Sequence, residues 1–134
     1  MKTILFSMLL LFSINGFSFN WKMVAEESGS TFYVDVDNIK KRNGFVYYWN
    51  LVDYIEPTKI GAYSDISKYR ADCVDEKQTW LSNTFYSQPL AEGKIITEGI
   101  PVWNHYGSTL NEIRYLTPGS IEHNLLQKVC DFVK

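Results

Sequence analysis

Aromatic and β-branched residues fall in short runs that turn-forming residues separate. Phe, Trp and Tyr make up 16% of the chain, and such residues favour the pleated, half-buried surface of a β-strand. The clearest turn is Asn43-Gly44 between two of these runs, because both residues tolerate the positive φ angles of a tight hairpin. This pattern predicts a sheet of antiparallel strands rather than a bundle of helices.

Six strands are expected along the chain. In the second, one face is apolar, while Tyr33, Asp35 and Asp37 share the other face, as period-two alternation requires. The strand that follows Asn43-Gly44 carries large apolar residues on both faces, so we expect it to be central. The expected strands cover residues 21–26, 31–37, 45–54, 62–74, 79–87 and 94–98.

A helix is expected at the C-terminal end, after a loop over residues 99–107. Thr117 precedes a proline and Ser120 follows a glycine, so either is a candidate N-cap. Apolar residues then recur at helical spacing and form one stripe. A single terminal helix on one face of a mostly antiparallel sheet is an α+β architecture. The stripe consists of Ile121, Leu125, Leu126, Val129, Cys130 and Val133.

The first 18 residues have the order of a secretory signal peptide. Lys2 precedes an apolar run over residues 4–14, and Gly16 and Ser18 have the spacing of the small residues before a cleavage site. The run is shorter than the roughly 20 apolar residues of a transmembrane helix, which argues against an uncleaved anchor or a buried strand. We expect cleavage after Ser18, with Gly16 as the second choice, and a single domain over residues 19–134.

The chain has two cysteines, Cys73 and Cys130, and both lie in the expected mature part. Exported proteins meet an oxidising compartment in which disulfides persist, so we expect a bond rather than two unlinked buried thiols. The spacing is far from any CxxC, which excludes a thioredoxin-type centre and a zinc knuckle. A loop of 57 residues (130 minus 73) gives a stabilisation of up to about 4 kcal/mol in the chain-entropy model. The bond would staple the helix to the sheet.

The charge balance argues against a nucleic-acid partner. The whole chain has 13 basic and 15 acidic residues. Removal of Lys2 with the signal peptide leaves 12 basic residues against 15 acidic ones, so no basic field for nucleic acid exists. No cysteine follows the expected cleavage point to accept a lipid, and the mature chain is therefore expected to have no membrane anchor.

Motifs for catalysis, cofactors and metals are absent: neither GxSxG, HExxH, SxxK, a P-loop nor GxGxxG occurs. His105 and His123 have no Cys, Asp or Glu at ligand spacing, so we interpret both as surface or packing residues. Asp35 and Asp37 have a separation that suits two glycosidase carboxylates, but alternating carboxylates are more typical of a solvated strand face. We expect no enzyme activity, no catalytic residue, no metal and no cofactor.

Two features are candidates for an interaction surface. One helix cannot cover both faces of so aromatic a sheet, so some rings should stay partly exposed, and interfaces favour Tyr and Trp; alternatively, the rings only thicken the core. The basic tip Lys40-Lys41-Arg42, expected to project from the hairpin turn, suits an acidic partner, but such a tip is more typical of solubility or protection of a sheet edge. The aromatic residues concerned are Tyr47, Tyr48, Trp49, Tyr54, Tyr63, Tyr69, Phe85 and Tyr86.

Short motifs occur in a fixed order along nearly all of the expected mature chain. They are Trp21 with Val24, Thr31-Phe32-Tyr33-Val34-Asp35, Ile39, Tyr48-Trp49-Asn50-Leu51-Val52-Asp53-Tyr54, Ser64, Ser67, Asp72-Cys73, Tyr86-Ser87, Pro118-Gly119-Ser120 and Cys130. In this order the chain resembles the surface-adhesin protein E family of Gram-negative bacteria. The resemblance implies a six-stranded antiparallel sheet with a C-terminal helix tied to its concave face by the disulfide. It also implies adhesion to host matrix and serum proteins and a tendency to form homodimers.

The expected function is that of an exported, noncatalytic binding module for host or envelope proteins. The alternative is a periplasmic inhibitor or accessory protein of an envelope enzyme, with the loop over residues 103–106 as the inserting segment. Because the chain lacks the lipid-accepting cysteine of a surface lipoprotein, the periplasm is the expected location, and the cell surface and the medium are the alternatives. No partner-binding residue of the family can be matched here, so these residues stay unassigned.

Overall fold

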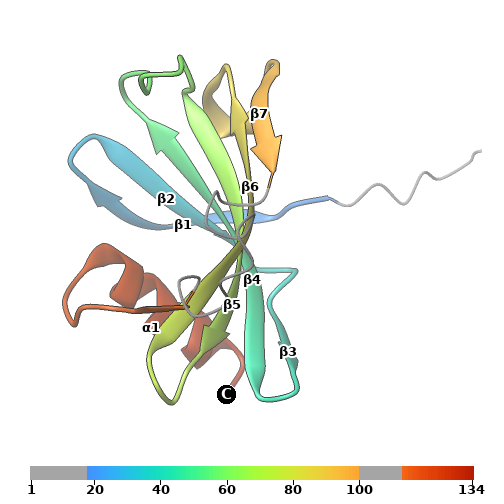
Figure 1. Ribbon diagram of the computed structural model, residues 1–134, viewed down its shortest axis with the longest axis vertical. Coiled ribbons are helices and arrows are strands. Elements are labelled where there is room, and N and C mark those ends of the chain that lie inside the picture. Colours follow the sequence, from blue (N-terminus) through green and yellow to red (C-terminus); the bar gives the residue numbers. More distant parts are fainter. Residues whose placement is uncertain (1–17, 100–112) are drawn as a thin grey trace, which may run out of the picture.

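The computed structural model describes residues 18–99 and 113–134, and it confirms the α+β architecture (Figure 1). A C-terminal helix packs against an antiparallel sheet. The elements in chain order are β1 (Trp21–Glu27), β2 (Ser30–Asp35), β3 (Lys40–Arg42), β4 (Phe45–Tyr54), β5 (Ser64–Asp72), β6 (Lys77–Tyr86), the 3-10 helix η1 (Pro89–Ala91), β7 (Ile95–Gly99), β8 (Ile113–Tyr115) and α1 (Ile121–Phe132).

The strands lie in the order β1-β2-β4-β5-β6-β7, and every pair is antiparallel. β4 has β5 along one edge, while its other edge is shared by β2 at residues 50–54 and by β3 at residues 45–47. β6 is shared in the same way, with β7 at residues 83–86 and β8 at residues 77–79. The described strands therefore fill six positions across the sheet, which agrees with the six strands expected.

Tight turns connect the strands where the sequence indicates them. Asn43 and Gly44 have φ angles of 52° and 81°, the left-handed pair of a type I′ hairpin. Ser28 and Gly29 repeat these values between β1 and β2. At Gly29 a side chain would also lack room, because a Cβ there would lie 2.6 Å from the Cγ2 of Ile55.

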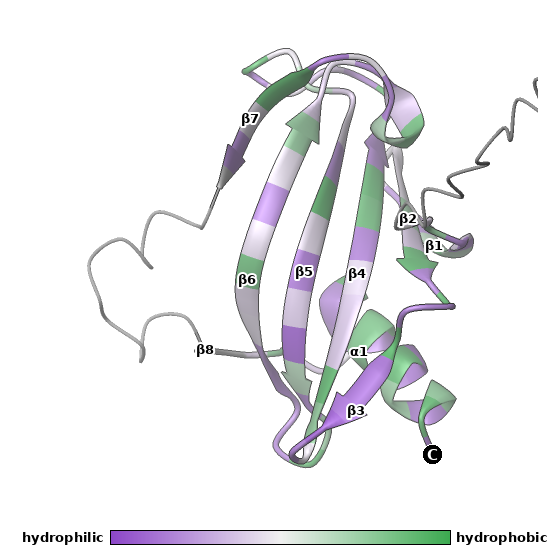
Figure 2. Ribbon diagram, turned by 90° about the vertical axis from the view of Figure 1, so that its right-hand side faces the viewer, coloured by the Kyte–Doolittle hydropathy of each residue, from purple (hydrophilic) through white to green (hydrophobic). Residues whose placement is uncertain are grey.

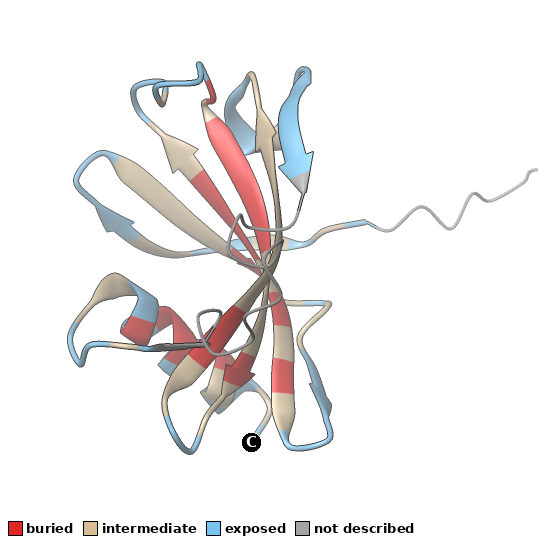
Figure 3. Cartoon of the chain, in the orientation of Figure 1, coloured by how far each residue is buried: buried red, intermediate tan, exposed pale blue. Residues whose placement is uncertain are grey.

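Helix α1 covers part of one face of the sheet, and we call this the helix face and the opposite one the open face. Figure 2 looks onto the open face, with α1 behind the sheet. Side chains of α1 pack onto side chains of β2, β4 and β5 to form the core. Figure 3 shows buried positions on α1 and on the strands beside it, and a second buried stretch along the other half of β4 and β5. The buried core residues are Val34, Val46, Tyr48, Ala71, Leu125, Leu126 and Val129.

Ser120 begins the helix: its Oγ accepts a hydrogen bond of 3.2 Å from the backbone N–H of His123. Of the two candidate caps, Ser120 is therefore the one used. His123 itself is buried, and its Nε2 lies 3.1 Å from Oε2 of Glu76 in the turn between β5 and β6. This places His123 in packing between α1 and the sheet.

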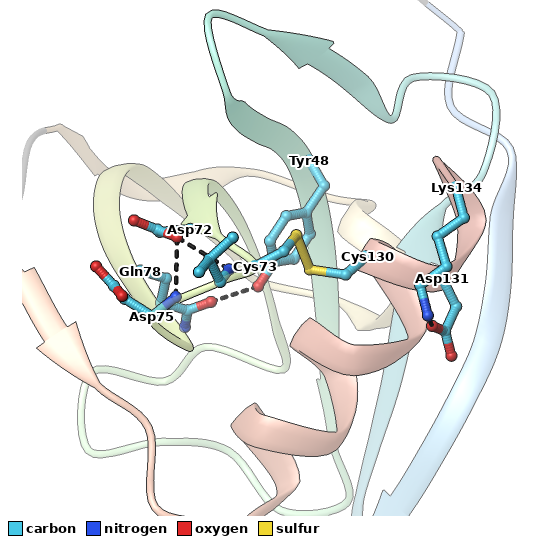
Figure 4. Close-up of a disulfide and its surroundings, with 9 residues drawn as sticks. Tyr48, Asp72, Cys73, Asp75, Gln78, Cys130, Asp131 and Lys134 are labelled. Carbon is cyan, nitrogen blue, oxygen red and sulfur yellow. Dashed lines mark hydrogen bonds and ion pairs between the residues drawn. A yellow bond between two sulfur atoms is a disulfide. The ribbon is translucent and has the colours of Figure 1, made fainter.

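The disulfide between Cys73 and Cys130 is present (Figure 4). Cys73 directly follows β5, and Cys130 lies in the last turns of α1, with 5.9 Å between their Cα atoms. The bond therefore fastens the C-terminal half of the helix to one end of the sheet, as the sequence predicts.

The solvated strand face expected for Asp35 and Asp37 is wrong for Asp35. Asp37 is exposed, but Asp35 has an exposed fraction of 0%. Its carboxylate accepts hydrogen bonds from the backbone N–H groups of Asn20 and Asp37 and from Nδ2 of Asn38. Asp35 ends β2 and uses its oxygens to close the turn that follows, so it is a structural residue.

The open face is covered at one end by the segment around η1. The backbone N–H of Leu90 donates to Asp53 at 2.7 Å, and the N–H of Ala91 donates to Oγ of Ser64 at 3.0 Å. Asp53 and Ser64 are paired across β4 and β5. This cover explains why Leu51 is fully buried although it lies on the face without the helix.

Candidate functional site

A patch of basic and aromatic side chains occupies the uncovered part of the open face. Strand alternation puts Phe45, Tyr47 and Trp49 of β4 on this face. Pairing then places Lys40 and Arg42 of β3, and Lys68 and Arg70 of β5, on the same side. We call these seven residues the cationic patch.

Three of the cations lie over aromatic rings in this patch. Arg42 is 4.9 Å from the ring centre of Tyr47, Lys68 is 5.2 Å from that of Trp49, and Arg70 is 4.9 Å from that of Phe45. Each such cation–π contact stabilises an exposed pair by about 0.5–1 kcal/mol. The rings therefore hold the cations in place and reduce the freedom that a bound partner would remove.

A hollow of about 340 Å³ opens beside the patch. Lys40, Lys41, Arg42, Lys68 and three further residues line it, and no carboxylate is among its described lining residues. None of the four patch cations forms a salt bridge within the described part of the chain. This local excess of positive charge stands out in a chain of formal net charge −2.

The helix face carries a different site, a groove of about 450 Å³ beyond the N-terminal end of α1. Polar side chains occupy buried positions along it: Asn50 is 4% exposed, Asp65 7%, Ser67 2% and Gln78 7%. The rings of Tyr48, Tyr69 and Trp80 line the same groove and follow one another across three strands, with centroid distances of 5.4 and 6.3 Å.

Asp65 is the carboxylate at the centre of these polar residues. Tyr54 donates its hydroxyl to Oδ2 of Asp65, and Ser67 donates to Oδ1 at 3.5 Å. Burial raises the pKa of Asp65 to about 6, and the two hydrogen bonds act in the opposite direction. Burial, together with the adjacent carboxylate, raises the pKa of Tyr54, so this hydroxyl remains a donor across the physiological range.

The residues singled out in the sequence divide between these two surfaces. Of the eight aromatic residues named there, Tyr48 is buried and the other seven are partly exposed. Lys40 and Arg42 join the patch, whereas Lys41 pairs with Val46 and has the opposite orientation. Asp35 and Asp37 do not form a carboxylate pair in a cleft. His105 and the loop over residues 103–106, on which the inhibitor hypothesis rests, lie outside the described residues.

Sequence reasoning missed Phe45, Lys68 and Arg70 in the cationic patch, and Asp65 and Asn50 in the groove. Asp65 is one polar residue inside a strand with no motif around it, and Asn50 lies in the motif over residues 48–54, which carries a family resemblance but indicates no ligand chemistry. The strand alternation that assigns their common face was available, but the burial of that face depends on how far α1 extends. In the described part of the chain, no three His, Cys, Asp or Glu side chains gather as a metal site would require, and no helix has the length and apolar character to cross a bilayer.

Known proteins share this fold. A family model described as surface-adhesin protein E matches residues 21–131. A crystal structure of Haemophilus influenzae protein E, crystal form II, is 20% identical with a TM-score of 0.54 and covers 84% of this chain and 99% of that one. Protein E from non-typeable Haemophilus influenzae is 18% identical with a TM-score of 0.53, over 84% of each chain.

A further structure of Haemophilus influenzae protein E is 17% identical with a TM-score of 0.55 and covers 83% of this chain and 93% of that one. At such identities the likeness shows the fold. No curated protein matches the sequence. The family and fold imply an adhesin-like, noncatalytic binding module of an exported or surface protein. Because the family model matches most of the length of this chain, the chain belongs to the surface-adhesin protein E family.

Proposed function

We propose that this chain is an exported, noncatalytic binding module that docks an acidic surface of a protein partner onto its cationic patch. In this proposal the partner is a host matrix protein or a protein of the cell envelope. The signal-peptide pattern of residues 1–18 and the Cys73–Cys130 disulfide support export. Without a lipid-accepting cysteine after the cleavage point, the mature chain is placed in the periplasm in this proposal.

The observation that carries the proposal is the set of preorganised, unneutralised cations. Lys40, Arg42, Lys68 and Arg70 have no carboxylate within salt-bridge distance among the described residues, and three of them lie over rings. An acidic partner meets four opposite charges on β3 and β5, the two strands that flank this part of β4, and charge complementarity of this kind speeds association and selects partners.

The geometry favours a protein partner over two other occupants. A membrane surface takes protruding apolar side chains, but the large exposed apolar residues, such as Ile55 and Val74, are not in the patch. Single-stranded nucleic acid stacks its bases on open ring faces, whereas Arg42, Lys68 and Arg70 lie over the rings here.

The test compares two triple variants of the mature chain, residues 19–134. In the patch variant, Lys40→Gln, Arg42→Gln and Lys68→Gln remove three charges. In the matched control, Lys22→Gln, Lys59→Gln and Lys94→Gln remove three exposed charges elsewhere. Binding is measured by biolayer interferometry against immobilised matrix proteins and against individually purified envelope proteins, at low and at physiological salt.

The patch variant should bind its partner at least tenfold more weakly than the wild type, and the wild-type affinity should fall as salt increases, because exposed charges are screened. The control should change affinity by less than twofold. Equal losses of affinity in the two variants would show that binding depends on the net charge of the protein and not on the patch. The absence of any wild-type partner in both protein panels would count against a binding module.

Fractionation of the producing cell tests the location separately. The periplasmic fraction should hold the oxidised mature chain that begins at Phe19. Recovery of the uncleaved chain in the cytoplasm would contradict the export part of the proposal.

A further inference from the structure

The groove on the helix face lies opposite the cationic patch and has the reverse charge. Asp65 of β5 and Glu122 of α1 line it, and no Lys, Arg or His is among its described lining residues. Its volume of about 450 Å³ falls within the range of small-ligand pockets, about 300–1,000 Å³. The groove exists because α1 begins at Ile121 and covers only part of the helix face.

Aromatic rings form much of the rest of the groove wall. Phe32, Tyr69, Trp80 and Tyr115 contribute them from four different strands. Carboxylates together with several aromatic rings are the combination that recognises ammonium and guanidinium groups, because the ring faces and the carboxylates both attract positive charge.

Asn50 gives an independent indication of a ligand. Its side chain lines the groove and is 4% exposed, yet its amide has no hydrogen-bond partner among the described residues. Gln78 is similar on its nitrogen side: its Oε1 accepts from Tyr48, and its Nε2 has no partner there. Neither residue has a side-chain polar atom that is both fully buried and unpartnered, so these polar atoms are accessible from the groove and available to a ligand.

Asp65 lacks a counter-charge among the described residues. Its two oxygens receive neutral hydroxyl donors from Tyr54 and Ser67, but its negative charge has no cation beside it in the described structure. Asn50 is paired with Ser67 across β4 and β5, and Val52, two residues along β4, is paired with Asp65. Carboxylate, hydroxyl and amide oxygens are therefore neighbours on one wall.

We propose that this groove is a binding site for an organic cation, whose ammonium or guanidinium group contacts Asp65 and Asn50 while its carbon chain lies against Tyr69 and Trp80. The cation supplies the positive counter-charge for the carboxylate of Asp65, and its N–H groups donate a hydrogen bond to the amide oxygen of Asn50. A basic side chain of a partner protein and a free polyamine share this chemistry.

The partial positive charge at the N-terminal end of α1, which lies at the groove, does not cancel the groove's preference for a cation. A helix N-terminus carries partial positive charge, but the Oγ of Ser120 already accepts from the N–H of His123, and Glu122 places a carboxylate in the first turn. The net charge of the described groove residues is therefore negative.

Binding should depend on pH because the carboxylate must be ionised. Burial raises the pKa of Asp65 to about 6, and a cation in the groove lowers it again. The other titratable groups along the groove are Glu122 and the tyrosines at positions 48, 54, 69 and 115. Affinity is expected to fall as the pH drops from 7.5 to 5, because protonation of Asp65 removes the central negative charge.

The experiment measures affinity by isothermal titration calorimetry with three probes on the full mature chain. They are a nonapeptide of Arg, Lys and Gly, the same peptide with Gln in place of each basic residue, and spermidine. The variants are Asp65→Asn, Asn50→Ala and the charge-matched control Asp131→Asn, which lies near the far end of α1 and is exposed. Nitrogen–proton NMR spectra follow the indole N–H of Trp80 and the side-chain amide of Asn50.

The cationic probes should bind and shift both NMR signals, while the neutral peptide should not. Asp65→Asn should weaken binding at least tenfold, Asn50→Ala severalfold and Asp131→Asn less than twofold. Binding of the basic peptide alone identifies a protein side chain as the occupant, and binding of spermidine as well identifies a free amine. Equal binding of the neutral peptide, unchanged affinity in Asp65→Asn, or no binding of either cationic probe at millimolar concentration would overturn the inference. The proposed function is tested with different variants, those of the cationic patch, so a failure of the groove proposal leaves that test unaffected.

Discussion

Replacing Asp65 by asparagine should stabilise the protein at neutral pH. An Asp carboxyl has an ordinary pKa of 3.8, and burial raises that of Asp65 to about 6. At 1.36 kcal/mol for each pH unit, this difference corresponds to a penalty of about 3 kcal/mol when the buried group is ionised. The asparagine side chain would carry no charge and would still offer an oxygen to the hydroxyl of Tyr54. We therefore expect a gain of up to about 3 kcal/mol at pH 7.5, or roughly 10 °C in Tm.

The sign of this effect should follow pH. Because the pKa of Asp65 is raised in the folded state, the penalty is full above about pH 6 and fades as the pH falls towards 3.8. The advantage of the asparagine variant should thus shrink to less than about 1 kcal/mol at pH 4. Urea denaturation of both proteins, followed by far-UV circular dichroism at pH 7.5 and pH 4, measures the two differences.

Asp35 provides the matched control. It is also fully buried, but its carboxylate accepts three N–H donors, and an amide in its place would turn its own NH₂ towards some of them. Asp35→Asn should therefore destabilise the protein by about 1–3 kcal/mol. The reasoning on Asp65 is refuted if Asp65→Asn is no more stable than the wild type at pH 7.5, or if its advantage is the same at both pH values.

Three further predictions concern the scaffold. Cys130→Ser should loosen α1 and lower the free energy of unfolding by up to about 4 kcal/mol; an unchanged thermal midpoint would show that the disulfide between Cys73 and Cys130 does not hold the helix. Leu126→Ala should cost about 2–5 kcal/mol, since Leu126 is 1% exposed in the core, whereas Phe132→Ala, at an exposed position, should cost far less in the same urea titration. Gly29→Ala should destabilise more than Gly44→Ala: both glycines have φ +81°, but only at Gly29 does a new Cβ meet Ile55, so similar midpoints in a thermal melt would contradict the close contact.

Much of the fold follows from local patterns in the sequence. Alternation identified β2 and β4, the Asn43-Gly44 pair identified the turn between β3 and β4, and the Ser120 cap with its apolar stripe identified α1. These features depend on neighbouring residues only, which is why sequence reasoning can reach them. β3 and β8 are three-residue strands outside the six expected ones. The three exposed basic residues of β3 show no alternation that would indicate a strand, and the pairing of β8 with β6 lies more than thirty positions back in the chain.

The two candidate surfaces could be predicted only in part from the sequence. Once the hairpin register is known, Arg42 must lie opposite Phe45 and Lys40 opposite Tyr47, so one side of the cationic patch could have been derived. Lys68 and Arg70 require the register of β5 against β4, which no short-range signal sets. Alternation also assigns Asp35 to a face without saying what covers that face, and this is why its burial was not foreseen.

Site-specific photocrosslinking tests the central claim, that a protein partner docks on the open face. A photoreactive phenylalanine analogue replaces Tyr47 in the cationic patch, or Ile55, which is 78% exposed and outside it. Cells that produce each variant are irradiated alone and in contact with matrix proteins. The account predicts a discrete adduct from position 47 that is lost when Lys40, Arg42 and Lys68 are changed to glutamine, and none from position 55. Adducts of equal yield from both positions, or from position 55 alone, would contradict it.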